Sequence, residues 1–330
     1  MNPPVKTKRT RAGRWLRILA VIILLGGIAI NLIAYRHAYA MLHFTSGGAK
    51  TDKAEKLTTG QKIKVLFCGV NLPRAHTSIP PTSVGPAAGA VTIDCPSGIK
   101  LGAWFCPCED ASPLVILFHG YDAEKSGTVR EAQAFLKMKH SVLLVDFRGS
   151  GESSESYTTV GFREAEDVAA AVRYAREHLS PSKVILYGQS MGAAAVLRSV
   201  HCCDVQSDAI IVEAVFDRML NTTRHRFEAM GVPSFPSAEL LLFWGGRQFG
   251  FDAFSHNPVQ YAASVKCPIL FLHGSADPSA RIEEACHVFG AVPGQKTFRE
   301  FPGCRHEPTI ARFPNEWNET VSHFLNAPEN

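Results

Sequence analysis

The chain has 330 residues, of which 46% are apolar and 19% are charged, with a formal net charge of +4 at pH 7. This composition supplies enough apolar side chains for a large folded core and excludes a mostly disordered chain. Six of the 34 Lys and Arg residues lie within the first 17 positions, and the other 28 are balanced by 30 acidic residues. The remainder of the chain is therefore not basic, and we expect no nucleic-acid partner.

The first predicted element is a membrane-spanning helix over the uncharged apolar residues 18–35, which follows a basic tail at residues 1–17. About 20 apolar residues cross the ~30 Å hydrocarbon core of a bilayer. Because cations gather on the cytoplasmic side of such helices, we expect a single-pass protein with a cytoplasmic N-terminus and an extracytoplasmic domain. The alternative is a cleaved signal, since Ala38-Tyr39-Ala40 resembles a cleavage site, and the domain would then be secreted after cleavage near Ala40.

Residues 36–89 are polar and then rich in Pro, Ala and Gly, which predicts a linker with a short helix near residues 56–67. A folded domain is expected over residues 90–326, followed by a short tail at residues 327–330. The domain opens with two runs joined by Pro96-Ser97-Gly98, which predict an antiparallel hairpin.

After the hairpin, short apolar runs alternate with helical patterns. The alternation predicts an α/β fold with a mostly parallel, doubly wound sheet led by the antiparallel hairpin. Residues 217–265 interrupt it without a clear strand, and we expect a small, mainly helical cap insertion above the sheet. The expected strands are residues 113–118, 141–147, 183–188, 208–216, 268–274 and 297–301, and the expected helices are residues 129–140, 162–179, 191–201, 281–289 and a last helix after Pro314.

Ser190 stands in the sequence Gly-Gln-Ser-Met-Gly, between a predicted strand and a predicted helix. This context is that of a nucleophile elbow, in which flanking glycines allow a tight turn. A serine that only caps the following helix is the structural alternative. A serine hydroxyl needs a base and an orienting acid to become a nucleophile, so the hypothesis requires a histidine and an acid later in the chain.

His306 is the best candidate for the base, because it lies in a loop between the last predicted strand and the last helix. Asp277 is the best candidate for the acid, since it directly follows a buried strand at the sheet edge where sites collect. Glu213 and Asp217, near the end of the preceding strand, are reserve acids. His119 precedes Ser190 in the chain and is expected to be structural.

Two backbone N–H groups are expected to stabilise an oxyanion, those of Met191 and Tyr121. The motif lookalikes of nucleotide-binding loops are incomplete, so no nucleotide cofactor is implied. We expect no metal site, since the nine cysteines lack the spacing and partners of one, and their disulfide pairing cannot be deduced.

The chain resembles an α/β-hydrolase of the serine-aminopeptidase-like group over about residues 90–325. The resemblance implies a triad of Ser190, Asp277 and His306, and a cap over an acyl pocket. A membrane-anchored serine hydrolase acting on a carboxylic ester is the first expectation, with a thioesterase, a peptidase or a non-catalytic binding module as alternatives. The motifs that carry the resemblance are His119-Gly120, the run at residues 146–153, the elbow at residues 188–192, the run at residues 273–278 and the run at residues 303–308.

Overall fold

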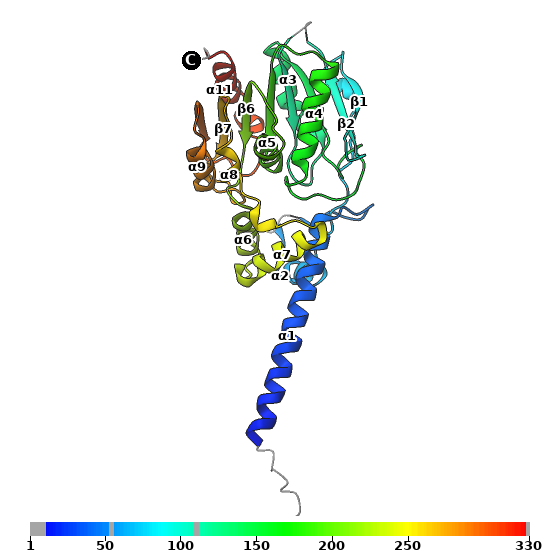
Figure 1. The fold of residues 1–330 in the computed structure, drawn as a ribbon, viewed down its shortest axis with the longest axis vertical. Helices are drawn as coiled ribbons and strands as arrows, with labels where there is room; N and C mark the ends of the chain where they lie inside the picture. The colour runs from blue at the N-terminus through cyan, green and yellow to red at the C-terminus, as the bar shows by residue number, and fades with distance from the viewer. Residues whose placement is uncertain (1–10, 53–55, 109–111, 328–330) are drawn as a thin grey trace, which may run out of the picture.

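The computed structural model describes residues 11–52, 56–108 and 112–327. They form one eight-stranded sheet in the order β1-β2-β4-β3-β5-β6-β7-β8 (Figure 1). The two pairs β1/β2 and β2/β4 are antiparallel, and all other neighbours are parallel. The expected hairpin and mostly parallel sheet are therefore confirmed. The strands are β1 Gly89–Asp94, β2 Lys100–Cys106, β3 Leu114–Phe118, β4 Ser141–Val145, β5 Val184–Gln189, β6 Ala209–Glu213, β7 Ile269–Gly274 and β8 Lys296–Phe301.

The central strands are apolar along their whole length because helices cover both faces of the sheet. All five residues of β3 and of β4 are buried, as a parallel sheet covered on both sides requires. Alternate side chains enter two separate cores: Ile116 packs in one and Leu117 in the other. One face carries α4 Glu164–His178, α5 Met191–Cys202, α8 Pro258–Ala262 and α9 Ile282–Ala291; the other carries α3 Val129–Lys137, α10 Thr309–Arg312 and α11 Pro314–Leu325.

The interval between β6 and β7 is helical, as expected. It contains α6 Met219–Met230 and α7 Ser234–Phe249, which pack on each other away from the sheet, a short 3₁₀ turn at Ala253–Ser255, and α8. We call α6 and α7 the cap. Since α8 packs on α5 and α9, it belongs to the helical layer on the sheet.

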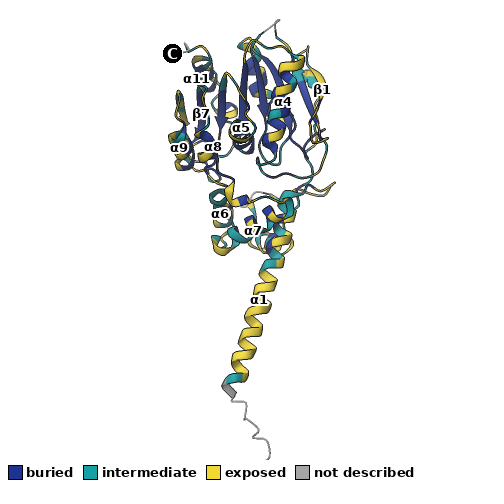
Figure 2. Cartoon of the chain, viewed as in Figure 1, coloured by how far each residue is buried: buried dark blue, intermediate teal, exposed yellow. Residues whose placement is uncertain are grey.

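The N-terminal helix α1, Arg11–Leu42, is longer than the expected 18–35 span. Its Gly13–Leu42 stretch is long and apolar enough to cross a membrane, with a mean hydropathy of 2.6 in its most apolar window, of which only 6% is buried. Most of α1 projects from the cap with exposed side chains (Figure 2). Most of the expected basic tail lies outside the described residues, as do positions 328–330 of the C-terminal tail.

The last turns of α1 pack against α7, and residues 36–89 are not a free spacer. Trp244 Nε1 donates a hydrogen bond to Asn31 Oδ1 at 3.1 Å, and the Tyr35 and Trp244 rings meet edge to face with centroids 5.5 Å apart. The short helix expected near 56–67 is α2, Thr59–Cys68, which begins with a capping box at Thr58 and packs on α1. The cap, α1 and α2 therefore form one helical body beneath the sheet (Figure 1).

Candidate active site

Ser190 lies in a tight turn between β5 and α5. Its φ of 52° is in the left-handed region, where a non-glycine residue is strained. A Cβ atom at Gly188 would lie 2.5 Å from the Gly192 carbonyl oxygen, and one at Gly192 would lie 2.4 Å from the Phe118 oxygen. No larger residue fits at either position, which is why the elbow requires glycine there.

The structure brings Ser190, His306 and Asp277 together from three separate loops at the carboxyl end of the sheet. Ser190 Oγ lies 3.1 Å from His306 Nε2, and His306 Nδ1 lies 2.6 Å from Asp277 Oδ2. Asp277 follows β7, and His306 lies between β8 and α10. The arrangement has the hydrogen-bond order of a nucleophile, a base and an orienting acid.

The Asp277 side chain is fully buried, whereas 27% of the His306 side chain is exposed. Burial opposes the charge of Asp277, but the hydrogen bond with His306 and those from the backbone N–H groups of Ala280 and Ser279 outweigh it. The pKa of Asp277 is consequently lowered. A carboxylate is therefore maintained beside the imidazole, where it stabilises an imidazolium.

The two expected oxyanion donors flank the serine. The Met191 N–H lies in the first turn of α5, where N–H groups have no intrahelical acceptor. The loop after β3 approaches from the other side, where a Cβ atom at Gly120 would lie 3.6 Å from Ser190 Cβ. Among the described residues, no acceptor binds the Tyr121 N–H, so both groups remain able to donate to a bound carbonyl.

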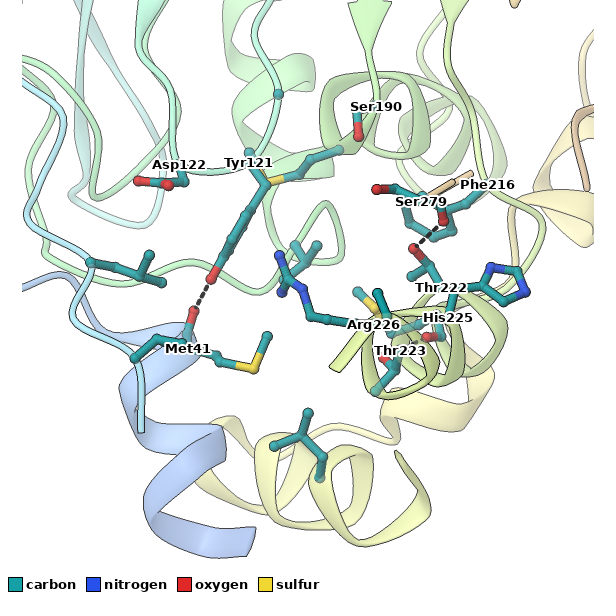
Figure 3. A pocket seen from close by; sticks show the side chains of 18 of the residues that line it. Met41, Tyr121, Asp122, Ser190, Phe216, Thr222, Thr223, His225, Arg226 and Ser279 are labelled. Carbon is teal, nitrogen blue, oxygen red and sulfur yellow. Dashed lines mark hydrogen bonds between the residues drawn. The ribbon is translucent and has the colours of Figure 1, made fainter. Parts of the chain in front are cut away.

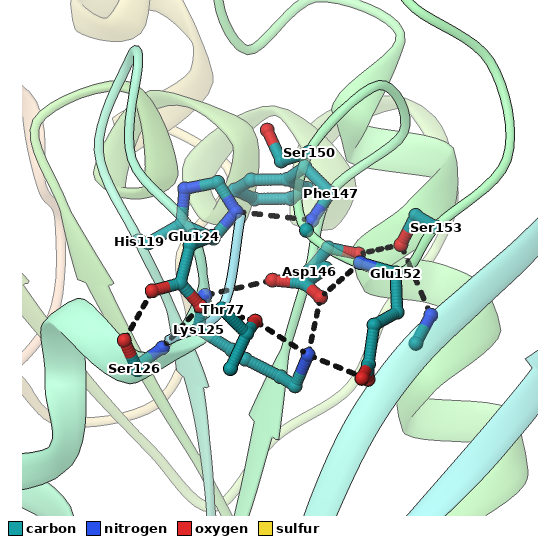
Figure 4. Close-up of polar contacts among 12 residues, drawn as sticks. Thr77, His119, Glu124, Lys125, Ser126, Asp146, Phe147, Ser150, Glu152 and Ser153 are labelled. Atoms are coloured by element: carbon teal, nitrogen blue, oxygen red, sulfur yellow. Dashed lines mark hydrogen bonds and ion pairs between the residues drawn. The ribbon is translucent and has the colours of Figure 1, made fainter. Parts of the chain in front are cut away.

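A buried polar network supports the loop after β3 (Figure 4). Lys125 Nζ lies 2.6 Å from Asp146 Oδ2 and 2.8 Å from Glu152 Oε2, and the Lys125 and Asp146 side chains are both fully buried. Asp146 Oδ1 also accepts the Lys125 N–H at 2.7 Å, and Lys125 Nζ lies 4.9 Å from the centroid of the Trp104 ring. The network joins the loop after β3 to the loop after β4, and no sequence pattern indicates it.

His119, which was expected to be structural, and the two reserve acids Glu213 and Asp217 have other partners. His119 is buried: its Nδ1 bonds the Gly120 oxygen at 2.8 Å, and its Nε2 accepts the Phe147 N–H at 3.1 Å, which fits the structural interpretation. Glu213 accepts hydrogen bonds from the Tyr187 hydroxyl and the Thr309 N–H. Asp217 accepts from Asn221 and lies 3.5 Å from His287. None of these three carboxyl and imidazole groups contacts Ser190 or His306.

A cavity of about 650 Å³ opens in front of Ser190 (Figure 3). That volume is typical of sites for small organic ligands. Its walls include the apolar cap residues Phe227, Met230, Leu241 and Leu242. Phe235 of the cap is 73% exposed and does not line the cavity.

The N-terminal region supplies another wall of the same cavity. His37, Ala38, Met41 and Leu42 of α1 line it together with residues of the expected linker. The Tyr121 hydroxyl donates to the Met41 oxygen at 2.5 Å, which ties the end of α1 to the loop beside the serine. This wall could not be predicted from the sequence, because an apolar helix and a Pro-rich segment carry no signal for a long-range contact.

Within the described ranges, no cluster of three or more His, Cys, Asp or Glu side chains could hold a metal ion. All nine cysteines are free in this structure.

Comparison with known proteins agrees with this architecture. The family model for the alpha/beta hydrolase fold matches residues 113–199, from β3 through the elbow and most of α5. The Pyrococcus furiosus esterase Pf2001 superimposes with a TM-score of 0.63 at 24% identity, covering 77% of this chain and 96% of the esterase. The Exiguobacterium antarcticum esterase EaEST gives a TM-score of 0.55 at 16% identity, covering 72% of this chain and all of that one. The chain is therefore an α/β-hydrolase-fold protein.

Related sequences extend over most of the domain. The uncharacterized Bacillus subtilis protein YqkD is 23% identical over 240 residues, which cover 72% of this chain and 78% of YqkD. The Schizosaccharomyces pombe protein bem46 is 24% identical over 220 residues, which cover 66% and 68% of the two chains. A membrane phospholipase A of known structure has a TM-score of 0.54 at 17% identity, covering 75% of this chain and 89% of that one. At these identities the structural likeness establishes the fold, and the activity must be argued from the site.

Proposed function

We propose that this protein is a membrane-anchored serine hydrolase that cleaves a carboxylic ester through an acyl-enzyme intermediate. The observation that carries the proposal is the aligned series of Ser190 Oγ, His306 Nε2, His306 Nδ1 and Asp277 Oδ2, with contacts of 3.1 and 2.6 Å. The esterases with the same fold support the choice of reaction.

In the first half-reaction Ser190 Oγ attacks the carbonyl carbon of the ester while its proton passes to His306 Nε2. Asp277 orients the imidazole and stabilises the imidazolium. The oxyanion receives hydrogen bonds from the Tyr121 and Met191 N–H groups. The carbon–oxygen bond then breaks, and His306 returns the proton to the departing alcohol.

In the second half-reaction water attacks the acyl-enzyme. His306 Nε2 accepts a proton from the water as the new carbon–oxygen bond forms. The bond between the acyl carbon and Ser190 Oγ then breaks, His306 returns the proton to Oγ, and the carboxylic acid is released. These two half-reactions need no cofactor. It also needs no leaving-group activation beyond protonation, which suits an ester better than an amide.

The anchor is α1, with the N-terminus in the cytoplasm and the hydrolase domain on the other side of the membrane. The exposed apolar surface of the projecting part of α1 supports this assignment. The contact of Tyr35 with Trp244 supports a cap placed against the membrane, because aromatic side chains gather at membrane interfaces.

A fluorophosphonate probe tests the nucleophile. The full-length wild-type protein should be labelled, and Ser190→Ala should not. A Ser199→Ala variant is the matched control, because Ser199 lies on the same helix and its hydroxyl bonds only the Val196 oxygen. Absence of labelling in a folded wild-type protein refutes the proposal. If the wild type is labelled, its rates on p-nitrophenyl esters, thioesters and aminoacyl amides show which acyl class it cleaves fastest.

A further inference from the structure

Arg226 of α6 projects into the cavity without a counter-ion. Figure 3 shows its side chain reaching from the cap into the cavity toward Tyr121, with Ser190 above it in this view. Its guanidinium carbon lies 5.4 Å from the centroid of the Tyr121 ring. No carboxylate among the described residues forms an ion pair with it.

Three acidic side chains near Arg226 are already paired with other cations. On the cap, Glu228 pairs with Arg281 at 2.7 Å and Glu239 pairs with Arg224. At the cavity wall, Asp122 pairs with Lys50 at 2.7 Å. Asp122, already paired with Lys50, acts on Arg226 electrostatically, but no carboxylate among the described residues lies in ion-pair contact with this guanidinium.

The other walls of the cavity are suited to an acyl chain. The apolar side chains named above line it from α6 and α7, and α1 closes another side. A guanidinium without an ion-pair partner in this cavity favours a ligand that carries a negative charge. Its planar arrangement of N–H groups matches the oxygens of a phosphate.

The location of the cavity indicates where such a ligand originates. A second, apolar groove lies between Trp244 and the α1 residues from Ile23 to Tyr35, so both hollows have α1 and α7 as walls. Ile63, Phe67, Phe235 and Phe243 are exposed on α2 and α7, the helices that surround the emerging α1. An apolar surface continuous with a membrane helix is the place where a membrane lipid meets the protein.

We propose that the substrate is a single-chain lipid ester that carries a phosphate, and that Arg226 is the specificity-determining residue that binds this phosphate. The inference rests on the proposed hydrolase function for its chemistry, whereas the binding of the phosphate can be measured without turnover. The acyl chain occupies the apolar part of the cavity, and the ester lies between Ser190 and the guanidinium.

The binding experiment uses the full-length protein in neutral detergent with the Ser190→Ala substitution, so that no ligand is cleaved. The matched ligands are oleoyl glycerol 3-phosphate and oleoyl glycerol, which differ only in the phosphate. The phosphate ligand should bind more tightly, and adding Arg226→Gln should weaken it by about 10- to 100-fold, the range for one charge-assisted hydrogen bond. Arg226→Lys should restore part of the loss, and Arg218→Gln, an exposed arginine outside the cavity, should leave the preference unchanged.

Three results would overturn the inference. Equal affinity for the two ligands would show that the phosphate is not recognised. An equal loss of affinity for both ligands in Arg226→Gln would show that Arg226 contributes only packing. If glycerol 3-phosphate binds as tightly as its oleoyl ester, the acyl chain contributes nothing to binding and the ligand is not a lipid. If Ser190→Ala binds as expected while the wild-type protein hydrolyses neither ester and resists the fluorophosphonate probe, the hydrolase function fails and the phosphate site stands.

Discussion

Replacing Asp277 with Asn tests the role of the acid with almost no change in volume. Asp277 Oδ1 accepts the N–H groups of Ser279 at 2.8 Å and Ala280 at 3.0 Å, and Oδ2 faces His306 Nδ1 at 2.6 Å. An asparagine must keep its carbonyl oxygen toward the two backbone N–H groups, so its NH₂ group points at Nδ1. His306 then carries its proton on Nε2, where it cannot accept the proton of Ser190. We expect kcat to fall by about 10⁴-fold, the loss associated with the wrong tautomer in a serine triad.

The assay is hydrolysis of a p-nitrophenyl ester by full-length protein in detergent, with circular dichroism to verify the fold. Asp217→Asn is the matched control, because Asp217 is also a buried carboxylate near a histidine, His287, but does not contact His306. It should retain most of the activity. If Asp277→Asn stays within about tenfold of the wild-type kcat, the tautomer argument is wrong and another group orients His306.

Three further substitutions test the supports of the site. Lys125→Met should lower the free energy of unfolding by about 3–5 kcal/mol in urea, because it leaves Asp146 buried without its cation, whereas Arg281→Met, at a pair with Glu228 in which both side chains are about half exposed, should cost at most about 1 kcal/mol; equal costs would contradict the burial argument. Tyr121→Phe should cost about 0.5–1.5 kcal/mol in thermal unfolding, since the Met41 oxygen loses its donor, and an unchanged Tm would show that this contact contributes nothing. Glu131→Gln tests a pH effect: burial, then the Glu213 charge, raises the pKa of Glu131 from 4.5 to about 8, so the folded wild type keeps the proton that the unfolded chain releases. The stability that Glu131 contributes to the wild type is present below pH 4.5 and is lost as the pH rises toward 8. The free energy of unfolding of Glu131→Gln should therefore rise relative to that of the wild type between these pH values. A difference that does not depend on pH would refute the assignment.

Most of the fold could be predicted from local sequence patterns. Short, continuous apolar runs such as 114–118 favour strands covered on both faces, and the glycines at 188 and 192 mark a turn in which backbone atoms approach too closely for side chains. Chain order, together with the position of Asp277 and His306 in loops that follow predicted strands, selected the three residues that the structure brings together.

The remaining features depend on contacts between distant segments. The Lys125–Asp146 ion pair joins two loops, and in the sequence Lys125 is indistinguishable from a solvated lysine. Arg226 lies on a polar helix, where an arginine ordinarily faces solvent. The packing of α1 on the cap depends on Asn31 and Trp244, which are 213 positions apart. Periodicity and composition report on neighbours along the chain and cannot report on such pairs.

The proposed anchoring places two different structural demands on α1. As part of the proposed anchor, residues near Ile23 need only be apolar, and almost any membrane helix could supply them. Residues 37–42 must instead fit the shape of a cavity and present a carbonyl to Tyr121. An exchange of the whole helix for an unrelated anchor would therefore preserve attachment and alter substrate choice, and natural variation in α1 should be wide in its first half and narrow in its last two turns.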